Sequence, residues 1–385
     1  MTNAYPDASS PYPTYGRFIR ELVEHLTETN LTISVVTPRL FQQSKALEIR
    51  GRERVYRFWF WSDNRLLIEY RRVPVFRMLT YLISGVLKGI RIVQKDSCCL
   101  IHAHWAFPAG LMALAVGSVL NKPVILTVHG SDARWAFEKK GLFEGLFGWV
   151  TRRADYVTAV SQNIARRTEA LGVEKEKIFV FPMGVSNGFF SLDPAEPLVP
   201  KDDRKAVIVS NRFLLPLYNV ECLIRAVPYV VSRCDKVLFL VASDGERKAA
   251  LESMVSQMNL LPWVRFLGSI PHRQMPALLK SSHIYVSTSL SDGTSVSLLE
   301  AMACGLFPVV TDIPANREWI KDGRNGFLVP TDDELALADR LNMALKDKAL
   351  RQKAKGINTK LVREKASWQR VSQNLMEIYG RLVAR

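Results

Sequence analysis

The stretch HIYVSTSLSDGTSVSLLEAMACGLFPVVTD, residues 283–312, contains the pattern that decides the fold. Two runs rich in β-branched residues, 283–289 and 307–312, flank a segment whose apolar residues recur every three or four positions. This spacing predicts a helix over residues 296–304, and Gly305 is a typical helix stop. A strand, a helix and a second strand in this order predict a βαβ unit with parallel strands.

The same alternation runs through the whole chain of 385 residues. Most of the strand-like runs are followed by a helical pattern, and their almost continuous apolar character is typical of parallel sheets that are covered on both faces. The class predicted is therefore α/β. The predicted strands are residues 32–37, 99–104, 123–130, 156–161, 206–211, 236–243, 264–268, 283–289 and 307–312.

One segment interrupts the alternation and indicates a domain boundary. Residues 182–205 are rich in Pro, Gly and Asp and separate two series of similar size. We interpret the series as two Rossmann-like doubly wound domains, 1–190 and 191–365, which face a cleft where the ligand binds at the carboxyl ends of strands. Residues 366–385 are expected to form a helix that crosses back to the N-terminal domain.

The start of the chain departs from this plan. A doubly wound domain normally begins with a strand, but here a polar, proline-rich segment leads directly into a helical pattern at Arg17. We therefore expect the first strand of the N-terminal domain to be truncated. Two explanations stay open: the chain start is assigned too late, or the sheet tolerates an incomplete first strand.

Composition and charge limit the classes of function. The chain is 48% hydrophobic and 23% charged, as in soluble globular proteins, and it has no apolar run of about 18 residues. We expect no signal peptide, because the first twenty residues are polar and proline-rich. We expect a cytoplasmic location. The formal net charge is +15, and residues 50–95 contribute 11 basic against 3 acidic residues, interleaved with aromatic ones. This mixture indicates an anionic partner with apolar character.

Residues 75–93 in this basic segment have two interpretations. They alternate apolar stretches with Arg77, Lys88 and Arg91. The first interpretation is a helix that lies on an anionic membrane surface, on the inner face of the cell membrane, and serves a lipid-linked acceptor. The second is an ordinary helix that covers a sheet with its basic residues in solvent.

The loop 291–295 and the helix that follows it have the chemistry of an anion site. A helix that starts directly after a strand offers unpaired amide groups and the positive end of its dipole, both of which suit phosphate. Glu300 lies one turn further along, where a carboxylate can accept hydrogen bonds from a ribose diol, and Asp292 can hold a sugar hydroxyl. The alternative is a capping acid and a glutamate on the helix surface.

This stretch resembles the motif of the retaining nucleotide-sugar glycosyltransferases of family 4, which have the GT-B fold. The family motif is an acidic residue, seven residues, a glutamate and then Ala-Met-Ala-x-Gly-x-Pro-Val-Val; here it is D-GTSVSLL-E-AMACGLFPVV. The following segment, 316–330, also matches, with Glu318 in the place of the family's glutamate. The resemblance extends over nearly the whole chain.

The resemblance implies roles for particular residues of this stretch. In the family the glutamate binds the donor ribose, the helix-start amides bind the diphosphate, and the first acid holds the donor sugar. Family members usually have glutamate at the first site, so Asp292 is a shorter acid there. The implied donor-binding residues are Gly293, Thr294, Ser295, Val296, Ser297 and Glu300, and Asp292 is implied to be catalytic.

The resemblance extends to three further segments. Residues 210–226 are similar to the family's Gly-Arg-Leu segment, which makes Arg212 a ligand of the donor diphosphate, whereas the following lysine of the family is replaced by Tyr218. His129, at the end of the strand 123–130, matches the histidine that contacts the donor sugar near the reacting carbon and is implied to be catalytic. Gly16 matches the glycine of the first loop, which approaches the donor.

A pair of residues before this histidine is assigned to the acceptor side. The segment IHAHWAFPAG, 101–110, places His104 and Trp105 at the end of a predicted strand. A supporting role behind the substrate is the alternative for both.

The reaction implied is transfer of a hexose from a nucleotide-diphosphate sugar to a hydroxyl acceptor with retention, as in cell-surface polysaccharide synthesis. The acceptor is expected to be a glycan or a lipid-linked glycan. No Asp-x-Asp metal motif occurs in the sequence, and no cofactor, metal or nucleic acid is expected. The alternatives are a nucleic-acid-binding protein, favoured only by the charge, a GT-B nucleotide-sugar epimerase and an inactive truncated homologue.

Overall fold

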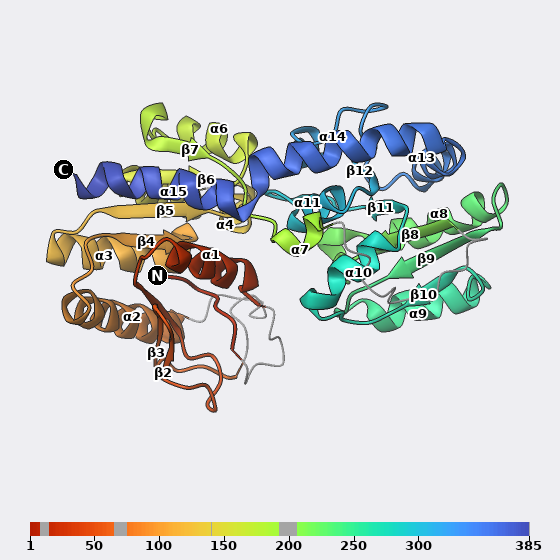
Figure 1. The fold of residues 1–385 in the computed structure, drawn as a ribbon. Coiled ribbons are helices and arrows are strands. Elements are labelled where there is room, and N and C mark those ends of the chain that lie inside the picture. The colour runs from red at the N-terminus through yellow and green to blue at the C-terminus, as the bar shows by residue number, and fades with distance from the viewer. Residues whose placement is uncertain (8–14, 65–74, 140, 192–205, 385) are drawn as a thin grey trace. The chain divides into compact units, whose positions relative to one another are not determined.

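The computed structural model describes residues 1–7, 15–64, 75–139, 141–191 and 206–384. The chain forms two compact units: Met1–Gly184 with Trp368–Arg385, and Val185–Ser367. The sequence placed these limits at 190/191 and 365/366, and residues 192–205 of its predicted boundary lie outside the described residues. Figure 1 shows the C-terminal helix α15, Trp368–Val383, within the N-terminal unit.

The described residues of the N-terminal unit form two sheets. One is a parallel sheet with the order β4-β5-β6-β7, and the other has the order β1-β3-β2, with β1 parallel and β2 antiparallel to β3. The strands are β1 Ile33–Pro38, β2 Leu47–Arg50, β3 Glu53–Phe58, β4 Ile101–His104, β5 Val124–Val128, β6 Tyr156–Ala159 and β7 Ile178–Val180. Besides α15, the helices are α1 Arg17–Glu28, α2 Val75–Lys95, α3 Leu111–Leu120, α4 Ser131–Lys139, α5 Leu142–Arg153 and α6 Gln162–Ala170.

Residues 1–3 lie between these two sheets. The amide of Thr2 donates to the carbonyl of Val36 in β1, and the amide of His104 in β4 donates to the carbonyl of Met1, both at 3.0 Å. Thr2 also forms a parallel bridge with His104. A short bridged stub thus takes the place in which the sequence predicts a truncated first strand.

The second unit contains one parallel sheet of six strands with the order β10-β9-β8-β11-β12-β13. The strands are β8 Ala206–Ser210, β9 Val237–Val241, β10 Val264–Phe266, β11 Ile284–Ser287, β12 Phe307–Thr311 and β13 Phe327–Val329. The helices are α7 Asn187–Phe190, α8 Val220–Val231, α9 Lys248–Gln257, α10 Met275–Lys280, α11 Val296–Ala303, α12 Pro314–Arg317, α13 Glu334–Lys346 and α14 Lys348–Ala366.

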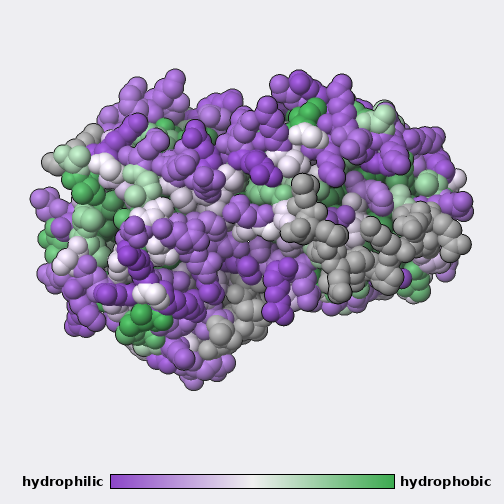
Figure 2. Space-filling model, in the orientation of Figure 1, coloured by the Kyte–Doolittle hydropathy of each residue, from purple (hydrophilic) through white to green (hydrophobic). Residues whose placement is uncertain are grey.

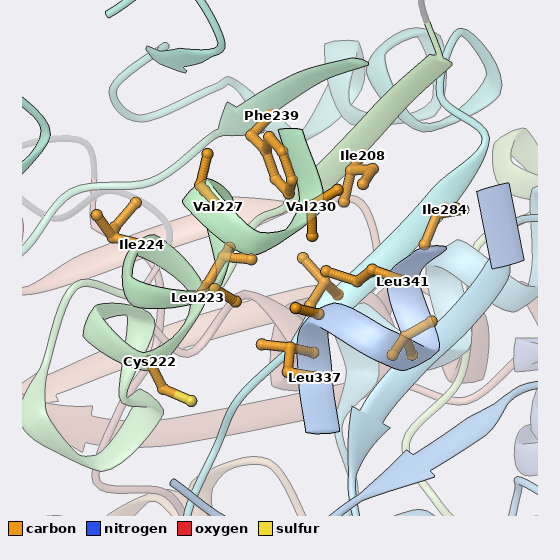
Figure 3. Close-up of a cluster of buried hydrophobic side chains, with 14 of the residues drawn as sticks. Ile208, Cys222, Leu223, Ile224, Val227, Val230, Phe239, Ile284, Leu337 and Leu341 are labelled. Atoms are coloured by element: carbon orange, nitrogen blue, oxygen red, sulfur yellow. The ribbon is translucent and has the colours of Figure 1, made fainter. Parts of the chain in front are cut away.

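Both faces of this sheet are buried in hydrophobic clusters. Successive residues of a strand point to opposite faces, so Ile208 of β8 enters one cluster and its neighbour Val209 the other. Figure 3 shows the first cluster, in which Leu223 of α8 and Leu341 of α13 pack toward the strands. Helix α11 packs into the second cluster. The doubly wound character predicted from the sequence is confirmed for this unit.

All nine predicted strands are present, and the described part of the chain contains four further strands that were not predicted, β2, β3, β7 and β13. Strand β3 lies in the basic segment 50–95, and its charged residues interrupt the apolar pattern by which strands were predicted. Its Arg57 is only 3% exposed and forms ion pairs with Glu48 and Asp7. The charge of residues 50–58 is therefore partly structural. Within the described residues, no helix is long and apolar enough to cross a membrane.

Candidate functional site

The polar residues of the predicted motif lie at the carboxyl ends of the strands in the six-stranded sheet of the second unit. Strands β8 and β11 are neighbours in the sheet, so the loops that follow Ser210 and Ser287 lie at the same edge. Helix α11 starts after the second loop and is capped by Ser295, whose Oγ accepts a hydrogen bond from the Leu298 amide at 3.2 Å. Ser295 is therefore the N-cap of α11.

Arg212, in the loop after β8, contacts the loop after β11 and the start of α11. Its guanidinium donates to Ser295 Oγ at 2.7 Å and to Ser297 Oγ at 2.8 Å, and its NH2 group lies 2.6 Å from Asp292 Oδ2. The residue is only 8% exposed, and its Nε atom is buried without a hydrogen-bond partner among the described residues. A buried cation with an unsatisfied donor at a helix start is suited to an anionic ligand.

Tyr218 covers this guanidinium. It ends a short 3₁₀ turn, Pro216–Tyr218, and its ring centre lies 4.2 Å from Cζ of Arg212. Burial lowers the pKa of Arg212, but Asp292 and the neighbouring tyrosines raise it, and the net direction is upward. The residue in the place of the family's lysine therefore keeps the arginine in position by stacking on it, instead of adding a second positive charge.

The remaining residues of the motif lie in the same loop and helix. The Gly293 amide donates to Asp292 Oδ1 at 2.9 Å, and the Thr294 hydroxyl donates to the Gly293 carbonyl. Val296 is partly buried at the first position of α11. The structure thus brings together the predicted residues Arg212, Asp292, Gly293, Thr294, Ser295, Val296 and Ser297.

Glu300 lies further along α11 and is buried, with 6% exposure. Its Oε1 atom lies 2.6 Å from Nε2 of His272. The alternative of a glutamate on the helix surface is therefore wrong. The sequence analysis did not select His272, and its position shortly after β10, at the same edge of the sheet, is the signal that could have found it.

A second group of predicted residues lies in the N-terminal unit. His104 ends β4, and His129 directly follows β5. Nδ1 of His104 lies 2.9 Å from Nε2 of His129, and the two rings stack with centres 5.2 Å apart. The rings of Trp105 and Phe18 lie 4.7 Å and 5.1 Å from the His129 ring. The acceptor-side pair and the predicted catalytic histidine are thus neighbours.

A third histidine extends this group. The His102 ring stacks on His104 with centres 4.4 Å apart, and its Nδ1 and Nε2 atoms each lie 2.7 Å from a hydroxyl, of Tyr379 and Thr127 respectively. Burial lowers the pKa of His102 and of His129 to about 3 and moves that of His104 well below its usual value. All three rings are therefore neutral near pH 7.

Asp132 also belongs to this edge and was not predicted. It accepts hydrogen bonds from the amides of Ala106, Gly130 and Ala133 at 2.9 to 3.1 Å. Burial raises its pKa, and the three amide donors oppose that shift. These hydrogen bonds connect the turn after His129 with the segment after Trp105.

Gly16 is required by local packing. It has φ of 78° before α1, and a Cβ atom there would lie 2.6 Å from the backbone carbon of Ala4. A larger residue would displace residues 4–5, so the structure explains this glycine without a ligand.

The comparisons with known proteins agree with the motif. The model of the family described as Glycosyltransferase Family 4 matches residues 15–187, and that described as Glycosyl transferases group 1 matches residues 194–360. The chain belongs to the group 1 glycosyltransferases of family 4. This glycosyltransferase is 29% identical over 284 residues to the phosphatidyl-myo-inositol mannosyltransferase of Mycobacterium leprae, over 73% of the chain and 72% of the relative.

Further similarities cover a larger share of the glycosyltransferase. It is 27% identical to the putative teichuronic acid biosynthesis glycosyltransferase TuaC of Bacillus subtilis, over 81% of the chain and 80% of the relative. Sucrose-phosphate synthase of Thermosynechococcus elongatus matches with a TM-score of 0.78 and 19% identity, over 96% and 93% of the two chains. Anabaena HepE in complex with UDP and glucose matches with a TM-score of 0.74 and 16% identity, over 97% and 98%. The matched structures show the GT-B fold.

The ion pair of Arg212 predicts a large effect for Asp292→Asn. The substitution leaves a buried guanidinium without its countercharge, so we expect it to lower the free energy of unfolding of the second unit by about 3 kcal/mol. Urea unfolding followed by tryptophan fluorescence measures this change. Asp312→Asn is the control, because the Arg317–Asp312 pair is exposed to solvent and such pairs contribute little to stability. Equal effects of the two substitutions on the free energy of unfolding would contradict the claim that Asp292 neutralises a buried Arg212.

The neutral histidines predict a pH dependence of stability. Histidines of the unfolded chain have a pKa of about 6.5, so the unfolded state binds more protons below that pH and stability falls as the solution is acidified. Each lowered histidine contributes a slope of up to about 1.4 kcal/mol per pH unit. His104→Asn keeps an amide near the position of Nδ1 but cannot titrate. We expect a shallower decline of the urea midpoint between pH 6 and pH 4, and an unchanged slope would show that His104 is not held neutral.

Proposed function

We propose that this glycosyltransferase moves a hexose from a nucleotide-diphosphate sugar to a hydroxyl acceptor, with retention of the anomeric configuration and without a divalent metal or other cofactor. The observation that carries the proposal is the position of two buried residues. Arg212 lies beside the start of α11 and has an Nε atom without a hydrogen-bond partner among the described residues, and Glu300 lies further along α11. A cation beside helix amides binds phosphate, and a carboxylate binds the hydroxyls of a ribose. A nucleoside diphosphate carries both groups.

The same geometry supports catalysis of the bond cleavage. The leaving diphosphate gains negative charge as its bond to the sugar breaks, and Arg212 with the amides of residues 295–297 stabilises that charge. These groups supply the positive charge that a metal ion supplies in other enzymes. Because Asp292 is paired with Arg212, the diphosphate shares this guanidinium or takes it over, and Asp292 with the Gly293 amide then holds the donor sugar.

Retention follows if the acceptor hydroxyl attacks the anomeric carbon from the face of the leaving group. The bond between sugar and diphosphate breaks, the bond to the acceptor oxygen forms, and the acceptor proton passes to an oxygen of the diphosphate. His129 contacts the sugar near this carbon in the family resemblance. A neutral imidazole there orients a sugar hydroxyl without adding charge, which agrees with its lowered pKa. The contacts of His104 and Trp105 with His129 support the proposal that both residues lie on the acceptor side.

The exposed apolar residues of helix α2 are relevant to the chemical class of the acceptor. Phe76, Leu79, Ile83 and Leu87 recur at helical spacing and are all exposed; we call this row the α2 stripe. The helix has four basic residues and no acidic one. Trp59 and Trp61 are also exposed, and Arg77 lies 5.9 Å from the Trp61 ring centre. Figure 2 shows one group of hydrophobic residues at the lower left, in the region where α2 and β3 lie in Figure 1, and further groups elsewhere on this face.

An exposed apolar stripe flanked by basic residues has the chemistry of a surface that lies on an anionic membrane. We therefore assign the acceptor to glycans or lipid-linked glycans of cell-surface polysaccharide synthesis, reached at the inner face of the cell membrane. The names of the relatives, a phosphatidylinositol mannosyltransferase and a teichuronic acid glycosyltransferase, support this class.

The donor site predicts selective stabilisation by nucleotide sugars. We expect at least one of the UDP-, GDP- and ADP-hexoses to raise the thermal midpoint of the wild type in EDTA. Saturation at 100 times the dissociation constant adds about 2.7 kcal/mol. Glu300→Ala is expected to lose most of this shift, because the ribose contact is removed. A donor-induced shift of the same size in Glu300→Ala would refute the site. With a glycosyl acceptor, NMR of the product must show the anomeric configuration of the donor.

The α2 stripe predicts binding to anionic vesicles. We expect the protein to co-sediment with vesicles of phosphatidylglycerol and phosphatidylcholine, weakly with phosphatidylcholine alone, and less at high salt. Leu79→Ser should weaken vesicle binding about tenfold, because one leucine side chain contributes roughly 1.5 kcal/mol when buried. Leu335→Ser removes an equally exposed leucine from α13 and is the control. Equal binding of the two variants would exclude the stripe as the membrane surface.

A further inference from the structure

His272 and Glu300 form a close pair from two different elements. His272 begins a 3₁₀ turn, His272–Gln274, between β10 and α10, whereas Glu300 lies in α11. The distance of 2.6 Å between His272 Nε2 and Glu300 Oε1 is that of a short hydrogen bond. A carboxylate can only accept a hydrogen bond, so Nε2 of His272 carries the proton and donates it.

The pair leaves one carboxylate oxygen available. Oε1 of Glu300 is bonded to His272, and no hydrogen bond to Oε2 comes from the part of the chain that the structure describes. The Glu300 residue is 94% buried, so its carboxylate loses much of its hydration, and hydrogen bonds must replace what is lost. The free oxygen is therefore suited to accept hydrogen bonds from hydroxyl groups of a ligand.

Packing fixes the imidazole that holds this carboxylate. The buried ring of Phe189, from α7, lies 5.2 Å from the His272 ring. The Phe189 carbonyl accepts a contact from Cys304 Sγ at the end of α11, at 3.5 Å. Segments α7 and α11 thus enclose the turn that carries His272. Since the histidine has little freedom, its hydrogen bond also removes rotational freedom from the Glu300 side chain.

We propose that His272 is a positioning residue that holds Glu300 Oε1, so that Oε2 accepts hydrogen bonds from the ribose hydroxyls of a nucleoside diphosphate. The proposal rests on the proposed function, because it assumes that the site at Arg212 and α11 binds a nucleoside diphosphate. It adds a consequence that this function does not contain: His272 controls the preference for ribose over deoxyribose. The phosphate contacts of Arg212 do not depend on it.

Isothermal titration calorimetry with UDP, GDP and ADP, with their 2′-deoxy counterparts and with inorganic pyrophosphate tests the proposal. His272→Phe keeps a ring against Phe189 but removes the donor. His272→Gln keeps an N–H donor near the position of Nε2. His283→Phe is the matched control, because His283 lies at the amino-terminal end of β11, the opposite edge of the same sheet.

We expect the wild type to bind at least one ribonucleotide more tightly than its deoxy counterpart. His272→Phe should weaken ribonucleotide binding about tenfold, the effect of losing a hydrogen bond to a charged group, and bring the two affinities close together. Pyrophosphate affinity should be unchanged, and His272→Gln should restore most of the ribose preference. His283→Phe should behave as the wild type.

The outcomes separate this inference from the proposed function. If the wild type prefers the ribonucleotide and His272→Phe keeps the same preference, the inference fails and the proposed function stands. If His272→Phe loses pyrophosphate binding to the same degree, the histidine supports the fold of the site and does not position Glu300. If no nucleotide binds the wild type, the proposed function fails and the inference fails with it.

Discussion

A buried guanidinium that must be neutralised is the constraint on which the second unit's functional edge depends. Arg212 lies 8% exposed, and every atom that satisfies it comes from the loop after β11 or from the start of α11. Removing a cation from water is costly, so the loop and the helix start must adopt the one arrangement in which serine hydroxyls and a carboxylate face it. The same arrangement leaves Nε without a partner among the described residues, which suits an anionic ligand.

The fold was predictable where burial dominates the sequence. Strands such as β8 and β11 are buried on both faces, and their uninterrupted apolar runs could not be mistaken for exposed segments. Strand β3 was missed because its sequence, ERVYRF, contains three charged residues whose partners lie elsewhere in the chain. Arg57 is neutralised by Glu48 and Asp7, and no local pattern reveals that pairing. The three-residue strands β7 and β13 are too short for periodicity to identify.

The candidate site was predictable to the same degree, and for a related reason. Asp292 and Glu300 were found because they stand in a motif of fixed spacing around one loop and one helix, and Arg212 because it stands in a second segment, 210–226, that resembles the family. His272 and Asp132 were missed because their importance arises from partners 26 or more residues away, Glu300 in one case and the Ala106 amide in the other. The stacking of Tyr218 on Arg212 could not be predicted either, because comparison with the family segment shows only that a lysine is replaced by tyrosine.

The two units treat charge in opposite ways, and the difference is consistent with the proposed reaction. The second unit concentrates a fixed positive charge and helix amides where a diphosphate would leave, so the charge that develops there meets groups already oriented toward it. The N-terminal unit encloses three neutral histidines among aromatic rings. Under the proposed function, a neutral imidazole near the sugar adds no positive charge that would oppose the one developing at the reacting carbon as the leaving group departs.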